Sequence, residues 1–153
     1  MQDPSVMPSK ITSLLEANGV SNVNVSGYEA ITGGYSRLMA RFEASFTIDG
    51  VDESGTYVLR GDPPKETALI ETDRTQEFEV LKAVSPYVDT PAARFLDGDG
   101  THIGTPALIL DFTQAESTLP WIAENGIGSL PEKLAGLAGA IHTIPLEKLP
   151  ASL

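Results

Sequence analysis

The chain has 153 residues, and its 10 Lys and Arg against 21 Asp and Glu give a formal net charge of −11. A surface this acidic is poorly matched to the phosphates of nucleic acid or to an anionic membrane face, so both are excluded as partners. The length and the 41% of hydrophobic residues suit a single domain with one core, and the absence of cysteine excludes disulfides and catalytic thiols.

The N-terminal residues predict a tail followed by one short helix. Residues 1–8 are predicted to be disordered, and Ser9 is the predicted N-cap of a helix that ends at Asn18-Gly19. The start of the chain has no signal-like apolar run, and no segment approaches the roughly 20 apolar residues of a membrane helix. We therefore expect a cytoplasmic protein.

Three antiparallel strands are predicted next. Val23–Ile31 is rich in β-formers, and Leu38–Ile48 alternates apolar and polar residues as a half-buried strand does. Asp49-Gly50 is a turn signal, and Thr56–Arg60 is the predicted third strand, which Gly61-Asp62-Pro63-Pro64 ends.

The rest of the chain predicts a long helix, two more strands and two short helices. Thr67–Val84 contains no Gly or Pro and carries a helical stripe that includes Arg74 and Glu77. The predicted strands are Ala92–Leu96 and Pro106–Thr113, joined at the turn Asp97–Gly100, and the predicted helices are Thr118–Glu124 and Pro131–His142. This order predicts an α+β fold with an antiparallel sheet of about five strands and one long packed helix.

The first candidate site is the glycine turn Thr32-Gly33-Gly34-Tyr35-Ser36. Paired glycines let backbone N–H groups approach a phosphate closely. A Walker loop or a dinucleotide fingerprint is excluded, because a strand and not a helix follows. Two interpretations stay open, a kinase-like loop over a nucleotide and a plain hairpin turn, and Gly-Gly alone favours the plain turn.

The second candidate is a pair formed by Arg60, at the end of the third strand, and Glu77, on the inward stripe of the next helix. An inward carboxylate needs a partner, and Arg60 is the natural one. A strand cation paired with a helix carboxylate is what kinases use to hold phosphates. The alternative is a solvated Glu77 at the edge of its stripe.

Other polar residues carry weaker signals. The strand Leu108–Thr113 turns polar at its end and could offer backbone groups to a purine, or it is an ordinary buried strand. Asp97, Asp99 and His102 do not fit the spacing of a calcium loop, so a turn is favoured over a metal site. His142 has no nucleophile or second His at a useful spacing, and a structural role is favoured.

In this order, the segments resemble the aminoglycoside phosphotransferase and choline kinase-like family, particularly the branch similar to the kinase-like domain attached to some acyl-CoA dehydrogenases. The matching segments span most of the chain and are Ile31–Ser36, Tyr57–Arg60, Gln76–Val84, Gly104–Phe112 and Leu137–His142. The resemblance implies a kinase-like N-terminal lobe over residues 9–114, with residues 115–153 as a linker and the start of a C-terminal lobe.

The resemblance also implies roles for particular residues. Residues Thr32, Gly33, Gly34, Tyr35, Ser36 and Arg37 would cover ATP or GTP, which binds with Mg²⁺. Arg60 would hold the α- and β-phosphates and Glu77 would fix Arg60, while the Asp111 C=O and the Thr113 N–H would meet the base. Two positions depart from the family, which usually has Asn or a similar small polar residue at the position of Arg37 and more commonly has Lys at the position of Arg60. Arg is planar and bidentate where Lys is a point charge.

The family's catalytic segment, His-Gly-Asp followed by four residues and Asn, does not occur in the sequence, nor does the later metal-binding Asp. The resemblance therefore implies one lobe of a small-molecule kinase, inactive alone, with its metal ligands and most acceptor contacts outside this chain. The exposed stripe Leu134, Leu137 and Ile141 would then favour self-association. The alternative function is a non-catalytic kinase-like module that binds a nucleotide or another protein.

Overall fold

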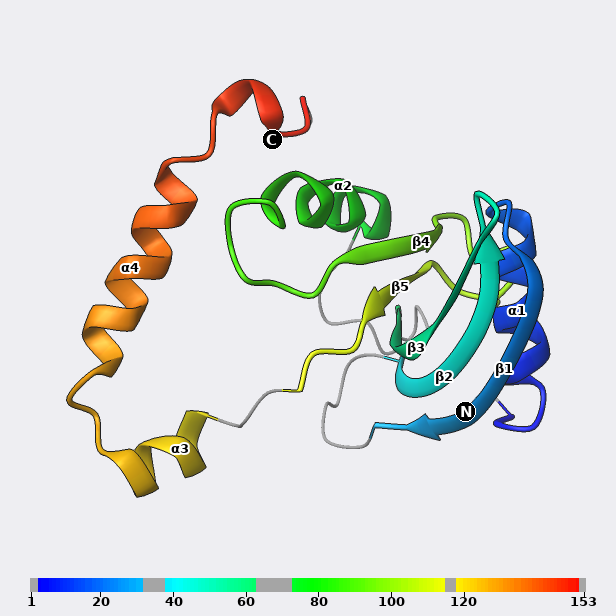
Figure 1. Cartoon of the computed structure of the whole chain (residues 1–153), viewed down its shortest axis with the longest axis horizontal. Helices are drawn as coiled ribbons and strands as arrows, with labels where there is room; N and C mark the ends of the chain where they lie inside the picture. The colour runs from blue at the N-terminus through cyan, green and yellow to red at the C-terminus, as the bar shows by residue number, and fades with distance from the viewer. Residues whose placement is uncertain (1–2, 32–37, 63–72, 115–117, 152–153) are drawn as a thin grey trace.

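The structure is a computed structural model that describes residues 3–31, 38–62, 73–114 and 118–151. The described residues form an α+β fold around one antiparallel sheet of five strands, in the order β1-β2-β3-β5-β4 (Figure 1). The strands are β1 Ser21–Ala30, β2 Leu38–Ile48, β3 Val51–Gly61, β4 Ala93–Asp97 and β5 Ala107–Asp111. The helices are α1 Met7–Ala17, α2 Arg74–Val84, α3 Thr118–Asn125 and α4 Leu130–His142, followed by the 3₁₀ turn η2 Leu146–Lys148. The predicted α+β class and the five-stranded antiparallel sheet are confirmed.

The β2–β3 hairpin forms the centre of the sheet. Its two-residue turn, Asp49-Gly50, has φ angles of 51° and 77°, and such positive values suit a turn that follows the right-handed twist of the strands. Pairing then runs without interruption from Ile48 opposite Val51 to Leu38 opposite Gly61. β3 is therefore longer than the predicted strand Thr56–Arg60, because its polar first half pairs fully with β2.

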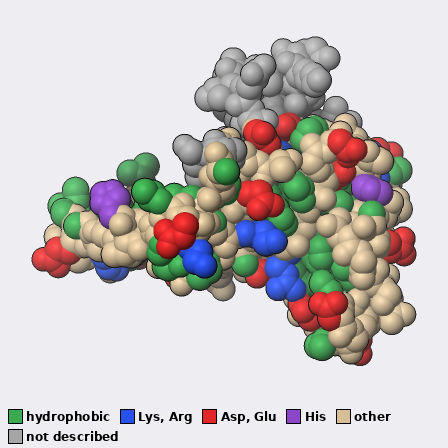
Figure 2. All heavy atoms as spheres, turned by 90° about the horizontal axis from the view of Figure 1, so that it is seen from above, with side chains coloured by type: hydrophobic (Ala, Val, Ile, Leu, Met, Phe, Trp, Pro, Cys, Tyr) green, Lys and Arg blue, Asp and Glu red, His purple; other side chains and the backbone are tan. Residues whose placement is uncertain are grey.

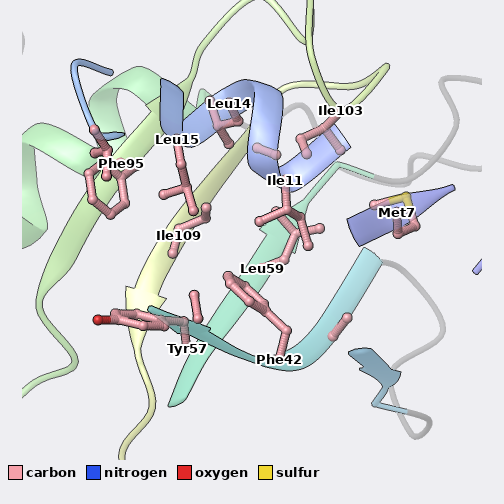
Figure 3. Packing of buried hydrophobic residues seen from close by; sticks show 14 of the residues in the cluster. Met7, Ile11, Leu14, Leu15, Phe42, Tyr57, Leu59, Phe95, Ile103 and Ile109 are labelled. Carbon is pink, nitrogen blue, oxygen red and sulfur yellow. The ribbon is translucent and has the colours of Figure 1, made fainter. Parts of the chain in front are cut away.

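Helix α1 covers one face of the sheet and forms the main core with it. Its inward residues are fully or almost fully buried against side chains of β2, β3, β4 and β5 (Figure 3). These residues are Met7, Ile11, Leu14 and Leu15 on the helix and Phe42, Tyr57, Leu59, Phe95 and Ile109 on the sheet. Each such side chain contributes about 1.5–3 kcal/mol through its burial.

The start of α1 differs from the prediction. The helix begins at Met7, and Val6 precedes it as the N-cap residue without a side-chain cap. The Ser9 hydroxyl instead donates a hydrogen bond to the Val6 carbonyl, at 2.8 Å. Pro8 suits the first helical turn and Met7 is buried in the core, so the helix extends into the segment predicted as a tail.

Helix α2 lies over the opposite face of the sheet, beside β4 and β5 (Figure 1). Leu108 and Leu110 are buried on this side, since they alternate along β5 with Ile109 of the main core. The predicted start of this helix at Thr67 lies outside the described residues, and α2 itself begins at Arg74. Asp73 has an extended backbone and its side chain accepts a hydrogen bond from the Gln76 N–H at 3.0 Å, so the helix is capped there.

Helices α3 and α4 project away from the sheet (Figure 1). Hydrophobic side chains lie among charged ones on this projecting part (Figure 2). Leu134, Leu137 and Ile141 of α4 are 56%, 46% and 47% exposed, as the predicted stripe requires. In the part of the chain that the structure describes, no helix has the length and apolar character needed to cross a bilayer.

Candidate functional site

Arg60 marks the end of the sheet to which the predicted nucleotide site was assigned. It lies opposite Met39 of β2 and Leu108 of β5. The Ile31 N–H donates to the Met39 carbonyl at 2.9 Å, so β1 ends and β2 begins beside Arg60. The glycine turn and Arg37, residues 32–37, lie outside the described residues. The residues on both sides of that segment therefore belong to the same end of the sheet as Arg60.

The predicted pairing of Arg60 with Glu77 is present. Arg60 Nη1 lies 2.9 Å from Glu77 Oε1, which joins the end of β3 to the first turn of α2. The two side chains are 25% and 23% exposed. Glu77 is therefore not the solvated edge residue of the alternative interpretation, and the guanidinium group remains partly accessible to solvent.

A second arginine, to which the sequence analysis gave no role, completes the cluster. Arg74 Nη1 is bonded to Glu77 Oε2, and Arg74 Nη2 lies 2.6 Å from Asp62 Oδ1. The Arg74 side chain is 0% exposed, and a buried cation is tolerated only when carboxylates pair with it. The signal in the sequence was Asp62, which comes directly after β3 and two residues after Arg60, the spacing of residues that point to the same side of an extended chain.

The two residues whose backbone groups are predicted to meet the base, Asp111 and Thr113, lie at the end of β5 and just after it. The Asp111 N–H donates to the Ala92 carbonyl at 3.0 Å, and the Phe112 N–H donates to the Thr56 carbonyl at 3.1 Å. Thr113 follows the strand and is exposed, and within the described ranges its N–H donates no hydrogen bond. The roles of the Asp111 C=O and the Thr113 N–H in binding a base remain predictions.

Charged side chains hold the segment around Asp111 in place. The Arg41 guanidinium carbon lies 5.1 Å from the centroid of the Phe112 ring, a distance at which the cation is attracted to the ring face. Arg94 forms an ion pair with Glu53, and its Nε lies 3.8 Å from Asp111 Oδ1. Strand β2 thus contacts the segment after β5, and β4 is tied to both β3 and β5.

The acidic turn after β4 is a structural feature. The buried Asp97 carboxylate accepts hydrogen bonds from the backbone N–H groups of His102 and Ile103, at 3.1 and 2.7 Å. Asp99 accepts one from the Thr101 N–H at 3.0 Å, and this bond lowers the pKa of the Asp99 carboxyl. Across the residues the structure describes, no three His, Asp or Glu side chains form a group that could hold a metal ion.

A comparison with models of known protein families and with curated protein sequences finds no match.

Two shallow depressions on the surface have volumes of about 450 and 420 Å³. Neither is lined by a residue of the Arg60–Glu77–Arg74–Asp62 cluster; the first lies by Arg94 and Glu53, and the second lies by Asp97 and His102. The charged cluster at the end of β3 is therefore the feature that a functional proposal must explain.

Proposed function

We propose that this chain is the nucleotide-binding lobe of a phosphotransferase that moves the γ-phosphoryl group of ATP to a hydroxyl group of a small molecule. The observation that carries the proposal is the ion pair between Arg60 on the third strand and Glu77 on the helix after it. In protein kinases a Lys on the third strand and a Glu on the following helix form this pair, and the Lys contacts the nucleotide phosphates.

The position of the glycine turn supports the same proposal. In kinases a glycine-rich loop covers the phosphates that the strand cation holds. Here the residues that flank Thr32–Arg37 lie beside Arg60, at one end of the sheet. A guanidinium group that is one quarter exposed can present parallel N–H groups to phosphate oxygens, with a geometry that Lys does not offer.

The proposal places the base against apolar residues of the sheet, between Arg60 and the two backbone groups that are predicted to meet the base. Val58 lies two residues before Arg60 on the same face of β3, and Leu110 lies directly opposite Val58 on β5. The next residues along β5 lead to the Asp111 C=O and the Thr113 N–H. A purine packed against Val58 and Leu110 would direct its polar edge toward these two backbone groups, as nucleotide sites require.

The catalytic base, the Mg²⁺ ligands and most acceptor contacts are assigned by this proposal to a second lobe. Mg²⁺ bound with the nucleotide would neutralise charge that develops on the phosphates. The described residues do not include a set of ligands for it, so no step is assigned to a metal ion held by this chain. The chain alone is expected to bind a nucleotide without transferring its phosphoryl group.

The test is a titration of the chain with Mg-ATP, followed by NMR chemical shifts or by calorimetry. The wild-type chain is expected to bind, and Arg60→Met is expected to weaken binding about tenfold or more, the effect of losing one hydrogen bond to a charged group. Lys82→Met is the matched control, because Lys82 is an exposed cation in the last turn of α2. No binding by the wild-type chain would overturn the proposal.

Turnover separates the enzyme from the non-catalytic module. In a parent protein that contains both lobes, Arg60→Ala is expected to abolish phosphoryl transfer while the protein stays folded. Nucleotide binding without any turnover in that protein would instead favour a module that senses a nucleotide or contacts another protein.

A further inference from the structure

Arg74 has an unusual position for a charged residue, and the predicted nucleotide site does not account for it. Its side chain is fully buried in the first turn of α2, one helical turn before Glu77. Within the described residues its Nε has no hydrogen-bond partner. Burying an arginine in this way is costly, and apolar residues of similar volume often replace such a group without loss of stability.

The contacts of Glu77 suggest what Arg74 does. Glu77 divides its two oxygens between two arginines, with Oε1 toward Arg60 and Oε2 toward Arg74. A carboxylate that faces a single arginine can bind it side by side, through both oxygens and two parallel N–H groups. Because Arg74 holds Oε2, Glu77 contacts Arg60 through Oε1 instead of forming that arrangement.

Asp62 fixes the geometry from the other side. It comes directly after β3, two residues after Arg60, and its Oδ1 lies 2.6 Å from Arg74 Nη2. The strand and the helix are therefore joined twice, through Arg60 with Glu77 and through Asp62 with Arg74. These two connections hold Arg74, Glu77 and Arg60 in one fixed arrangement at the end of the sheet.

We propose that Arg74 is a positioning residue for the nucleotide site. By binding Oε2 of Glu77, it prevents Glu77 from taking Arg60 through both oxygens, and it offsets the Glu77 charge so that Arg60 attracts an anion. This inference rests on the proposed function, because it assigns Arg60 to the phosphates. It differs from a purely structural role in one respect, which is that Arg74 acts on binding only through the charge of Glu77.

The test compares the Kd for Mg-ATP of the wild-type chain, Arg74→Met, Glu77→Gln and the double variant, with Lys82→Met as the control for a lost charge. Arg74→Met is expected to raise the Kd about tenfold, the effect of one hydrogen bond to a charged group. In the Glu77→Gln background, Arg74→Met is expected to change the Kd less than about twofold, since a neutral amide cannot form an ion pair with Arg60. Lys82→Met is expected to match the wild type.

The possible results separate the two proposals. If the wild-type chain binds Mg-ATP and Arg74→Met binds equally well, the positioning role is overturned and the proposed function stands. Equal losses in the wild-type and Glu77→Gln backgrounds also overturn it, because Arg74 would then act independently of the carboxylate. If the wild-type chain does not bind, both proposals fail. Thermal unfolding checks that each variant is folded.

If Arg74→Met does not fold, Arg74→Lys provides the same test. It keeps the charge without the planar fork, so it is expected to bind Mg-ATP with an affinity between those of the wild type and a charge-free variant. The effect must again disappear when Glu77 is replaced by Gln. A Lys variant that loses as much affinity in the Glu77→Gln background as in the wild-type background would contradict the positioning role.

Discussion

Replacing Glu77 by Gln tests how much the charged cluster stabilises the fold. Gln keeps the shape of the side chain and removes the negative charge that Arg60 and Arg74 share. Arg60 is 25% exposed and can recover hydration, but Arg74 is 0% exposed and, among the described residues, retains only Asp62 as a partner. Breaking a fully buried pair costs about 3–5 kcal/mol, and exposed pairs are worth less than about 1 kcal/mol. Because Glu77 is 23% exposed, we expect a loss of about 2 kcal/mol.

Urea and thermal unfolding measure this loss. For a chain of this length, about 2 kcal/mol corresponds to a decrease in Tm of roughly 4–8 °C. Glu79→Gln is the matched control, since Glu79 lies on the exposed side of the same helix and forms no ion pair among the described residues. A Glu77→Gln variant as stable as Glu79→Gln, within about 0.5 kcal/mol, would show that the cluster does not stabilise the fold.

Three further predictions concern other parts of the chain. Gly100→Ala should destabilise the fold by about 2 kcal/mol or more in urea unfolding, because φ is +76° and the new Cβ would lie 2.6 Å from the Thr105 carbonyl carbon. Gly136 has open space around it, so Gly136→Ala should not cause this loss. Equal losses in the two variants would contradict the steric argument. The chain should self-associate with a second copy as its concentration rises in sedimentation, and Leu137→Glu, on the exposed stripe of α4, should abolish this; a wild-type monomer at every concentration would refute it. Burial raises the pKa of the Tyr57 phenol above 10.0, so its contribution to stability is complete below pH 10.0 and is lost as the pH rises through the folded-state pKa. In urea unfolding at alkaline pH, Tyr57→Phe should therefore lose less stability than the wild type. An equal loss in both proteins would exclude Tyr57 as the cause.

The parts of the fold that the sequence predicted well are those that depend on local pattern. Strand β2 has the predicted bounds, because residues such as Phe42 and Phe46 alternate with polar ones and are buried on a single face. The turn at Asp49-Gly50 followed from its residue types. β4 and β5 lie within two residues of their predicted ends, since both are apolar runs bounded by turn residues.

The parts that the sequence did not predict depend on contacts between distant segments. The sequence has no Gly or Pro in residues 67–84, and the start of α2 at Arg74 is shown by the extended backbone of Asp73 and by the hydrogen bond from the Gln76 N–H to its side chain. The pairing of Arg60 with Glu77 could be inferred because an inward carboxylate requires a cation. The same reasoning could have placed Arg74, but its partner Asp62 belongs to another element, and burial in the fold was needed to reveal the pair.

The composition of the α2 side of the sheet supports a ligand-binding role for this cluster. Beside the cluster, Val58 of β3 and Leu108 and Leu110 of β5 are apolar residues of this side, so a joint between α2 and β3 could have been built from apolar residues as well. The chain instead places four charged groups there, with Arg60 accessible to solvent and Arg74 completely buried behind Glu77. A charged cluster that apolar residues could replace without loss of stability is expected where a protein binds a charged ligand. The exposed end of this arrangement is a cation, so the ligand that we propose for it is an anion, such as the phosphates of a nucleotide.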